Sequence, residues 1–171
     1  MKCLLDMDGV LVDFVAGAAK HHGFDPVVVD RWDFVEKVGL TTAQFWNPLN
    51  ADFWAGLPWT PDGREILAAV EDAFGKENVC LLSSPCDTAG CMDGKLTWIR
   101  EHLPGYRRRF LFGPAKEFAA NGNRVLVDDS DGNAEAFRNA GGPVLLVPRP
   151  WNRLAGQDAL EEVRRWLNFL K

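Results

Sequence analysis

Long apolar runs are absent from this chain of 171 residues. No run approaches the ~18 residues that a membrane-spanning helix requires, so the sequence predicts no membrane span and no membrane partner. The first eight residues already contain Asp6 and Asp8, which the apolar region of a signal peptide would exclude. We therefore expect the mature chain to start at Met1 and the protein to be cytoplasmic.

Positive charge is also scarce. Lysine and arginine total 19 against 24 acidic residues, a formal net charge of −5, whereas proteins that bind long nucleic acids usually carry a basic excess. Long nucleic acid is therefore not an expected partner. The four cysteines form no Cys-x-x-Cys pair, so the spacing of a zinc site is missing. Cys86 and Cys91 lie in a polar loop, where a redox or metal role stays open.

The apolar residues that are present, 47% of the chain, are enough for the core of one domain. Four short apolar runs without alternation predict buried parallel strands, and a fifth is weaker. They lie at residues 2–5, 79–82, 124–127 and 144–147, with the weaker run at 110–112. Amphipathic patterns between these runs predict helices. Such alternation indicates an α/β fold, a Rossmann-like parallel sheet flanked by helices.

One interval breaks the alternation. The stretch between the first two predicted strands is far longer than one crossover helix needs, and it contains four of the chain's seven tryptophans. Thr41 and Gln44 have the spacing of a capping box, which predicts a short helix. We therefore predict a small helical cap at residues 14–59, inserted after the first strand. The core domain is predicted at residues 1–13 and 60–171.

Acidic residues follow two of the predicted strands. Asp6 and Asp8 end the first strand before Gly9, and Asp128 and Asp129 follow a later strand. The carboxyl ends of parallel strands form the ligand-binding edge of such a sheet. Carboxylates gathered there repel one another unless a cation lies between them, and Mg²⁺ prefers such oxygen ligands. The sequence therefore predicts a magnesium site at this edge.

A hydroxyl and a lysine are expected at the same edge. The strand at 79–82 leads into Ser83 and Ser84, and Lys116 follows the weaker strand. Together with the metal and a carboxylate nucleophile, these groups suit phosphoryl transfer, which depends on positioning and on neutralising spread negative charge.

The order of these motifs resembles the haloacid dehalogenase (HAD) superfamily of phosphatases, and more narrowly the 5′(3′)-deoxyribonucleotidases. The matching stretches are DMDGVLVDF at 6–14, FWAGLP at 53–58, LSSP at 82–85, KLTW at 95–98, VDD at 127–129 and PWN at 150–152. Two features depart from the family: serine stands where threonine is frequent, and the residues around Lys116 differ from the usual ones.

The resemblance implies roles for individual residues. Asp6 would form an aspartyl-phosphate, and Asp8 would act as general acid and then general base. Mg²⁺ would be held by Asp6, the main-chain carbonyl of Asp8 and one acid of the Asp128–Asp129 pair, with Asp129 favoured. The phosphate would be bound by four residues, with Ser83 favoured over Ser84 as the hydroxyl donor: Ser83, Ser84, Lys95 and Lys116.

The expected substrate is a small phosphorylated molecule, most simply a (deoxy)nucleoside monophosphate. Aromatic faces stack on bases, and we select Phe14 and Trp54 for that contact, although most cap aromatics are expected to form the cap's own core. The alternatives are a phosphatase for sugar phosphates or nucleic-acid ends, and a phospho-accepting receiver-like signalling domain. Base preference, 5′ against 3′ phosphate, and monomer against homodimer stay open.

Overall fold

The computed structural model describes residues 1–170, and its centre is a five-stranded parallel sheet with the strand order β3-β2-β1-β4-β5. The predicted α/β fold is confirmed, and all five predicted runs are strands. Two of them extend one residue further than predicted, so that Ser83 and Asp128 are the last residues of their strands. The strands are β1 (Lys2–Leu5), β2 (Val79–Ser83), β3 (Phe110–Phe112), β4 (Arg124–Asp128) and β5 (Val144–Leu146).

Alternating side chains of these strands fill two cores. Cys3 and Leu5 of β1 belong to the larger core, whereas Leu4 faces the smaller one, as the period of two in a strand requires. The larger core is closed by α4 (Gly63–Phe74), α5 (Cys91–His102) and α7 (Ala159–Asn168), and the smaller one by α6 (Asp131–Asn139). The sheet is therefore covered on both faces.

The N-cap of α6 is Ser130, whose hydroxyl accepts from Asn133 N. Asp131, the first residue of the helix, accepts from the main-chain N of Arg153 at 2.9 Å. Since Ser130 takes the cap, α6 begins immediately after the acidic pair at the end of β4.

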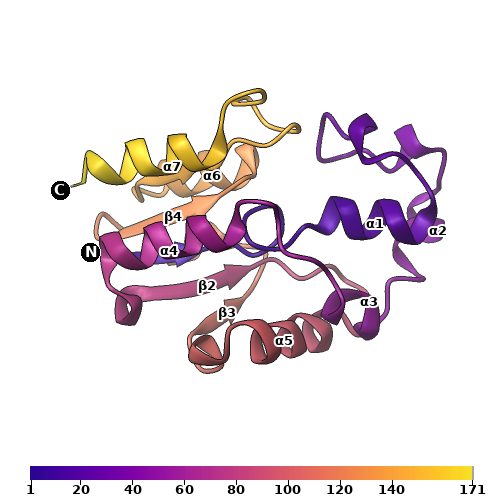
Figure 1. Cartoon of the computed structure of the whole chain (residues 1–171), viewed down its shortest axis with the longest axis horizontal. Helices are drawn as coiled ribbons and strands as arrows, with labels where there is room; N and C mark the ends of the chain where they lie inside the picture. The colour runs from indigo at the N-terminus through magenta and orange to yellow at the C-terminus, as the bar shows by residue number, and fades with distance from the viewer. Residues whose placement is uncertain (171) are drawn as a thin grey trace.

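A small helical region follows β1, as predicted. It contains α1 (Phe14–His22), the 3₁₀ turns at Pro26–Val28 and Glu36–Val38, α2 (Thr42–Trp46) and α3 (Ala51–Ala55). The predicted capping box at Thr41 and Gln44 is present. Figure 1 shows this region, the cap, beyond the end of the sheet toward which the strand arrows point. The chain enters and leaves it side by side, because Asp13 N donates to Pro58 O at 2.8 Å.

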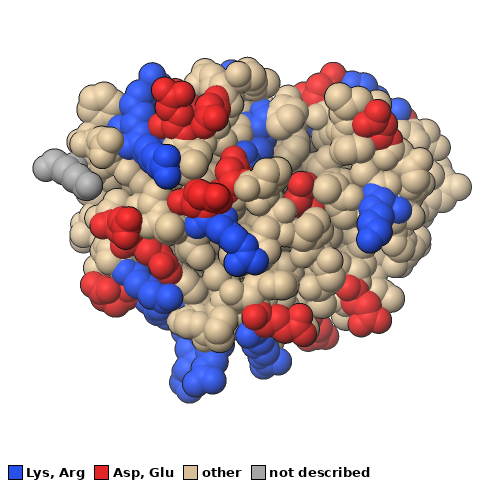
Figure 2. Space-filling view, viewed as in Figure 1, with Lys and Arg blue, Asp and Glu red and all other residues tan. Residues whose placement is uncertain are grey.

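No helix among residues 1–170 is long and apolar enough to cross a membrane. On the face drawn in Figure 2, basic and acidic side chains are interspersed, without an extended patch of one sign among the described residues.

Candidate active site

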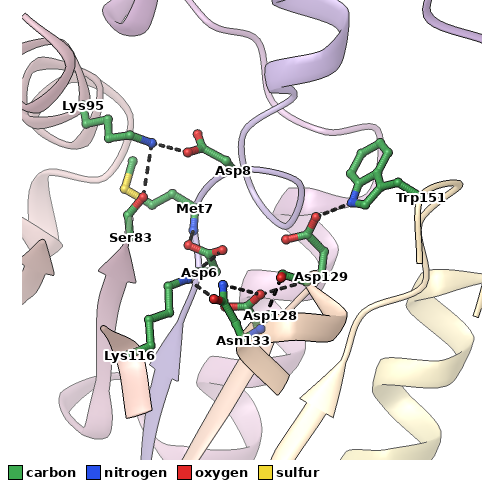
Figure 3. Close-up of polar contacts among 11 residues, drawn as sticks. Asp6, Met7, Asp8, Ser83, Lys95, Lys116, Asp128, Asp129, Asn133 and Trp151 are labelled. Carbon is green, nitrogen blue, oxygen red and sulfur yellow. Dashed lines mark hydrogen bonds and ion pairs between the residues drawn. The ribbon is translucent and has the colours of Figure 1, made fainter. Parts of the chain in front are cut away.

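The carboxyl ends of β1 and β4 bring three charged side chains into contact. Lys116, from the 3₁₀ turn Lys116–Ala119, places its Nζ 2.8 Å from Asp6 Oδ2 and 2.7 Å from Asp128 Oδ2. All three side chains are buried. The lysine therefore bridges two neighbouring strand ends and balances charges that would otherwise repel each other (Figure 3).

The two acids of the 128–129 pair have different surroundings. Both oxygens of Asp128 are engaged, since Ser130 N donates to Oδ1 at 2.8 Å and Asn133 Nδ2 lies 3.2 Å from each oxygen. Asp129 receives one side-chain bond, from the indole Nε1 of Trp151 to Oδ2 at 2.6 Å. Asp129 thus keeps more free acceptor capacity than Asp128, as a direct metal ligand requires.

A second lysine lies on the other side of Asp6. Lys95 of α5 is buried, and its Nζ pairs with Asp8 Oδ2 and lies 3.2 Å from Ser83 Oγ. Two buried polar atoms near it, Asp8 Oδ1 and Ser84 Oγ, have no partner among the described residues. Because buried polar atoms are normally hydrogen-bonded, these two indicate that a ligand belongs beside them.

Burial shifts the pKa values of this cluster. It raises the pKa of Asp6 to about 7; Lys116 opposes that rise, while the carboxylates of Asp128 and Asp8 add to it. Burial also raises the pKa of Asp129, and the charges of Asp128 and Asp6 reinforce it. For Lys116 burial lowers the pKa, but the attraction of Asp6 and Asp128 outweighs it and the net shift is upward.

The turn after Asp8 depends on glycine. Gly9 has φ +73°, and a Cβ added there would lie 2.2 Å from Asp129 Oδ2. A larger residue would therefore strain the backbone and displace this carboxylate. Arg149 holds the turn from outside, because its guanidinium donates to the carbonyls of Gly9 and Val10 while it pairs with Asp62.

Three carboxylates are close enough to share a metal ion. One oxygen each of Asp6, Asp128 and Asp129 lies within 4.8 Å of the others. We call the six charged side chains at the strand ends the strand-end cluster: Asp6, Asp8, Asp128, Asp129, Lys95 and Lys116. When all are ionised, four carboxylates and two ammonium groups leave two negative charges. A hard divalent cation such as Mg²⁺ suits both that charge and the all-oxygen donor set.

A cavity of about 360 Å³ opens above the cluster, large enough for a small organic ligand. Asp6, Asp8, Asp129 and Ser84 lie on its wall, whereas Ser83 and Lys95 lie behind it. Phe14 and Trp54 line it as selected from the sequence, and their rings stack at 5.3 Å. Trp32 and Trp46 complete the aromatic wall; with Phe14 and Trp54 they form what we call the cap aromatics.

Several residues that support this site have no role predicted from the sequence. Trp151 binds the carboxylate of Asp129, and Asn152 Nδ2 donates at 2.8 Å to the main-chain oxygens of both Asp129 and Val147. The PWN stretch was visible as part of the resemblance, but nothing in it indicated contact with Asp129. Two further residues, Trp32, which is 45% exposed, and Asn133, belong to no sequence motif. Only their residue type could have indicated a role in the site.

No protein-family model matches the chain, and no curated protein matches it. Among solved structures, it is similar to the crystal structure of the defluorinating L-2-haloacid dehalogenase Rha0230. The TM-score is 0.54 at 14% identity, over 98% of this chain and 95% of that one. A HAD family enzyme from Bacteroides thetaiotaomicron gives 0.46 at 14% identity, over 99% of this chain and 98% of that one. The first likeness shows that the chain has the HAD fold.

Proposed function

We propose that this protein is a Mg²⁺-dependent phosphomonoesterase that acts through an aspartyl-phosphate and takes (deoxy)nucleoside monophosphates as substrates. The observation that carries the proposal is the pairing of Asp6 with Lys116 beneath a cavity that Asp8 and Asp129 also line. A carboxylate nucleophile, a neighbouring acid and a buried cation are the groups that phosphoryl transfer through an acyl phosphate needs.

The first half of the reaction forms the covalent intermediate. The Asp6 carboxylate attacks phosphorus, and the bond from phosphorus to the ester oxygen breaks. Asp8 gives its proton to the departing alkoxide. Its Oδ1, which has no partner within the described chain, is the atom suited to carry that proton, while Oδ2 stays with Lys95.

The second half releases phosphate. Asp8, now ionised, takes a proton from a water molecule, and the oxygen of that water attacks phosphorus. The bond between phosphorus and Asp6 breaks, which restores the carboxylate beside Lys116. The cap excludes bulk water around the intermediate, because its aromatic side chains form the upper wall of the cavity.

Asp6, Asp129 and the main-chain carbonyl of Asp8 would hold Mg²⁺, with Asp128 behind them. When bound, the ion stabilises the negative charge that spreads over the phosphoryl oxygens. Lys116 neutralises charge on the nucleophile side. Ser83 was favoured as the hydroxyl donor to phosphate, but its Oγ lies 3.2 Å from Lys95 Nζ and the residue does not line the cavity. We therefore assign that role to Ser84, whose hydroxyl has no partner among the described residues, and Lys95, which was expected to bind phosphate, orients Asp8 and Ser83.

A nucleobase fits the cap aromatics better than a sugar alone does. Trp32 is partly exposed and lies at the cavity wall with Trp46, so a flat ring entering the cavity can stack on them. Phe14 and Trp54 line the same cavity but are nearly fully buried, so they form the inner part of the stacking surface. Trp32 supplies its exposed part.

The test is phosphate release from all nucleoside 5′- and 3′-monophosphates and several sugar phosphates, with Mg²⁺ or with a chelator. Asp6→Asn keeps the shape of the side chain and removes the nucleophile, and Asp72→Asn, on the exposed side of α4, is the matched control. We expect release from nucleotides that depends on Mg²⁺, is lost in Asp6→Asn and is retained in Asp72→Asn.

Other outcomes would redirect the proposal. Release confined to sugar phosphates would retain the chemistry and overturn the substrate class. Stable phosphate labelling of Asp6 without turnover would favour the receiver-like alternative. A 2-haloacid belongs in the panel because the dehalogenase Rha0230 shares the fold, and halide release without phosphate release would overturn the phosphatase proposal.

A further inference from the structure

Two thiols lie at the edge of the main cavity and have no part in the mechanism above. Cys86, in the loop between β2 and α5, lines that cavity, and Cys91 is the first residue of α5. The main-chain N of Cys86 donates to Cys91 Sγ at 3.3 Å, so the Cys91 sulfur lies against the Cys86 backbone. All four cysteines of the chain are free thiols.

The Cys86 thiol is set apart from the others by its surroundings. Its Sγ lies 2.9 Å from the hydroxyl of Thr88. Bonding from the Cys91 side chain lowers the pKa of Cys86 to about 6; burial opposes this, and Thr88 and the charge of Lys95 assist it. The hydrogen bond with Cys86, together with burial, raises the pKa of Cys91, although Lys95 and the main-chain N of Cys86 oppose that rise. Cys86 also lines the cavity, whereas Cys91 is fully buried behind it, so Cys86 is the thiol of the pair that a solute can reach.

Small solutes have access to Cys86 from two sides. Besides the main cavity it lines a second one of about 470 Å³, between the loop and α2, with Trp46 and Thr88 on its wall. Cys3 and Cys80 provide an internal contrast. Cys3 is fully buried in β1, and burial raises the pKa of both thiols. Cys86 therefore differs from Cys3 and Cys80 in the direction of its pKa shift and in lining a cavity.

We propose that Cys86 and Cys91 are a peroxide-reactive thiol pair, in which Cys86 attacks the oxidant and Cys91 resolves the product to a disulfide. The Cys86 thiolate attacks one oxygen of hydrogen peroxide, and the O–O bond breaks. The products are a sulfenic acid on Cys86 and a hydroxide ion. The Cys91 sulfur then attacks the Cys86 sulfur, and the S–O bond breaks as the S–S bond forms. The leaving hydroxide takes the Cys91 proton as water.

These two reaction steps are balanced in atoms and electrons. Two thiols and one peroxide give one disulfide and two waters, with both sulfurs oxidised and both peroxide oxygens reduced. A sulfenic acid without a resolving thiol is oxidised further to sulfinic acid, which is not reversed by thiols. On the cavity wall, a sulfinate would place a permanent negative charge where an anionic substrate binds. Cys91 therefore keeps the oxidation of Cys86 reversible.

Mass spectrometry of the intact, folded protein tests the pair without any assumption about enzymatic activity. After brief peroxide treatment we expect a Cys86–Cys91 disulfide, a loss of about 2 Da that dithiothreitol restores. In Cys91→Ser, whose hydroxyl still accepts from Cys86 N, we expect a gain of about 32 Da on Cys86 that dithiothreitol does not reverse. Cys80→Ser is the matched control and should behave as wild type.

Alkylation provides a second measurement in the unmodified chain. Iodoacetamide at neutral pH should modify Cys86 about 10-fold faster than Cys80, because most of the Cys86 thiol is ionised there. Equal rates for the two thiols would overturn the proposal. So would a wild-type protein in which peroxide produces sulfinic acid on Cys86 without the disulfide.

If Cys91→Ser does not fold, Cys86→Ser decides the question, because it should lose both the disulfide and the fast alkylation. Phosphatase activity after peroxide and then dithiothreitol should recover in wild type and stay lost in Cys91→Ser. An inactive wild-type protein would bear on the proposed function alone, since the masses report the thiol chemistry independently.

Discussion

The strand-end cluster and the cap aromatics face each other across one cavity, yet they are held by different forces. Lys116 is fixed by two carboxylates within 2.8 Å, and such charge-assisted bonds have narrow geometric tolerance. The cap aromatics pack ring on ring, as Phe14 does between Trp46 and Trp54 at 5.7 and 5.3 Å, and such packing tolerates small shifts. In the proposed function, the chemistry is located at the rigid sheet edge and substrate choice in the adaptable cap.

The largest effect is expected from removing the cation of the strand-end cluster. Lys116→Met leaves Asp6 and Asp128 buried without their partner, and breaking a buried pair in this way costs about 3–5 kcal/mol of unfolding free energy. Phosphatase activity should be lost as well, since the charge beside the nucleophile is gone. Urea denaturation and the phosphate-release assay measure the two effects.

Lys37→Met is the control for this change. Lys37 pairs with Asp30 on the surface of the cap, where an exposed ion pair contributes about 0–1 kcal/mol. If Lys116→Met were no more destabilising than Lys37→Met, the strand-end cluster would not be held more rigidly than the cap.

The strand-end cluster could be predicted from the sequence because the topology of the sheet determines where its residues lie. An apolar run followed by acids places Asp6 and Asp128 at strand ends, and parallel strands bring their carboxyl ends to one edge. Lys116 followed from chain order and from the charge that such an edge needs. Each of these inferences uses only a residue type and its position relative to a strand.

The remaining site residues could not be predicted because their roles depend on how loops meet. Trp151 lies in the segment after β5, and its indole Nε1 donates to Asp129, which directly follows β4. Trp32 and Trp59 are both cap-region tryptophans, but only Trp32 lines the main cavity, while Trp59 packs on Trp98. Composition cannot separate a tryptophan that packs from one that lines a cavity.

Metal and pH should act together on the strand-end cluster. In the metal-free protein the pKa of Asp6 is raised to about 7, so between about pH 4 and about pH 7 the native state binds a proton that the unfolded chain has released. Stability from this group is therefore present at low pH and lost as the pH rises through about 7. The part of this loss that comes from Asp6 should be absent in Asp6→Asn, whereas the part that comes from Asp129, whose pKa is also raised, should remain.

Saturating Mg²⁺ should offset that loss. At 100 times its dissociation constant, a ligand raises the unfolding free energy by about 2.7 kcal/mol, and the gain should be larger in mildly alkaline than in mildly acidic buffer, where protons compete for the carboxylates. Denaturation curves with Mg²⁺ and with a chelator measure the difference. A gain independent of pH would indicate that the ion binds away from Asp6 and Asp129.

The indole of Trp151 should tune metal binding. Trp151→Phe keeps an aromatic ring near Trp32 but removes the N–H that holds Asp129 Oδ2. Loss of such a supporting hydrogen bond typically weakens metal affinity by about 10–100-fold. The measurement is the Mg²⁺ concentration that gives half of the thermal stabilisation. Trp166→Phe, in α7, is the control, and an equal shift in both variants would mean that the effect is packing alone.

The smallest effect on catalysis is expected from substitutions in the cap. Two of them distinguish Trp32, a tryptophan that lines the cavity, from Trp59, which packs on Trp98 instead. Trp32→Ala removes a partly exposed ring from the cavity wall, which should weaken nucleotide binding by about 1 kcal/mol, seen as a higher KM with kcat unchanged. Trp59→Ala removes a ring that packs on Trp98 at 4.9 Å, and should lower the unfolding free energy by about 3 kcal/mol with KM unchanged. If Trp59→Ala raised KM and Trp32→Ala did not, the base would bind outside the cap aromatics, and the division between a chemical sheet edge and a selective cap would fail.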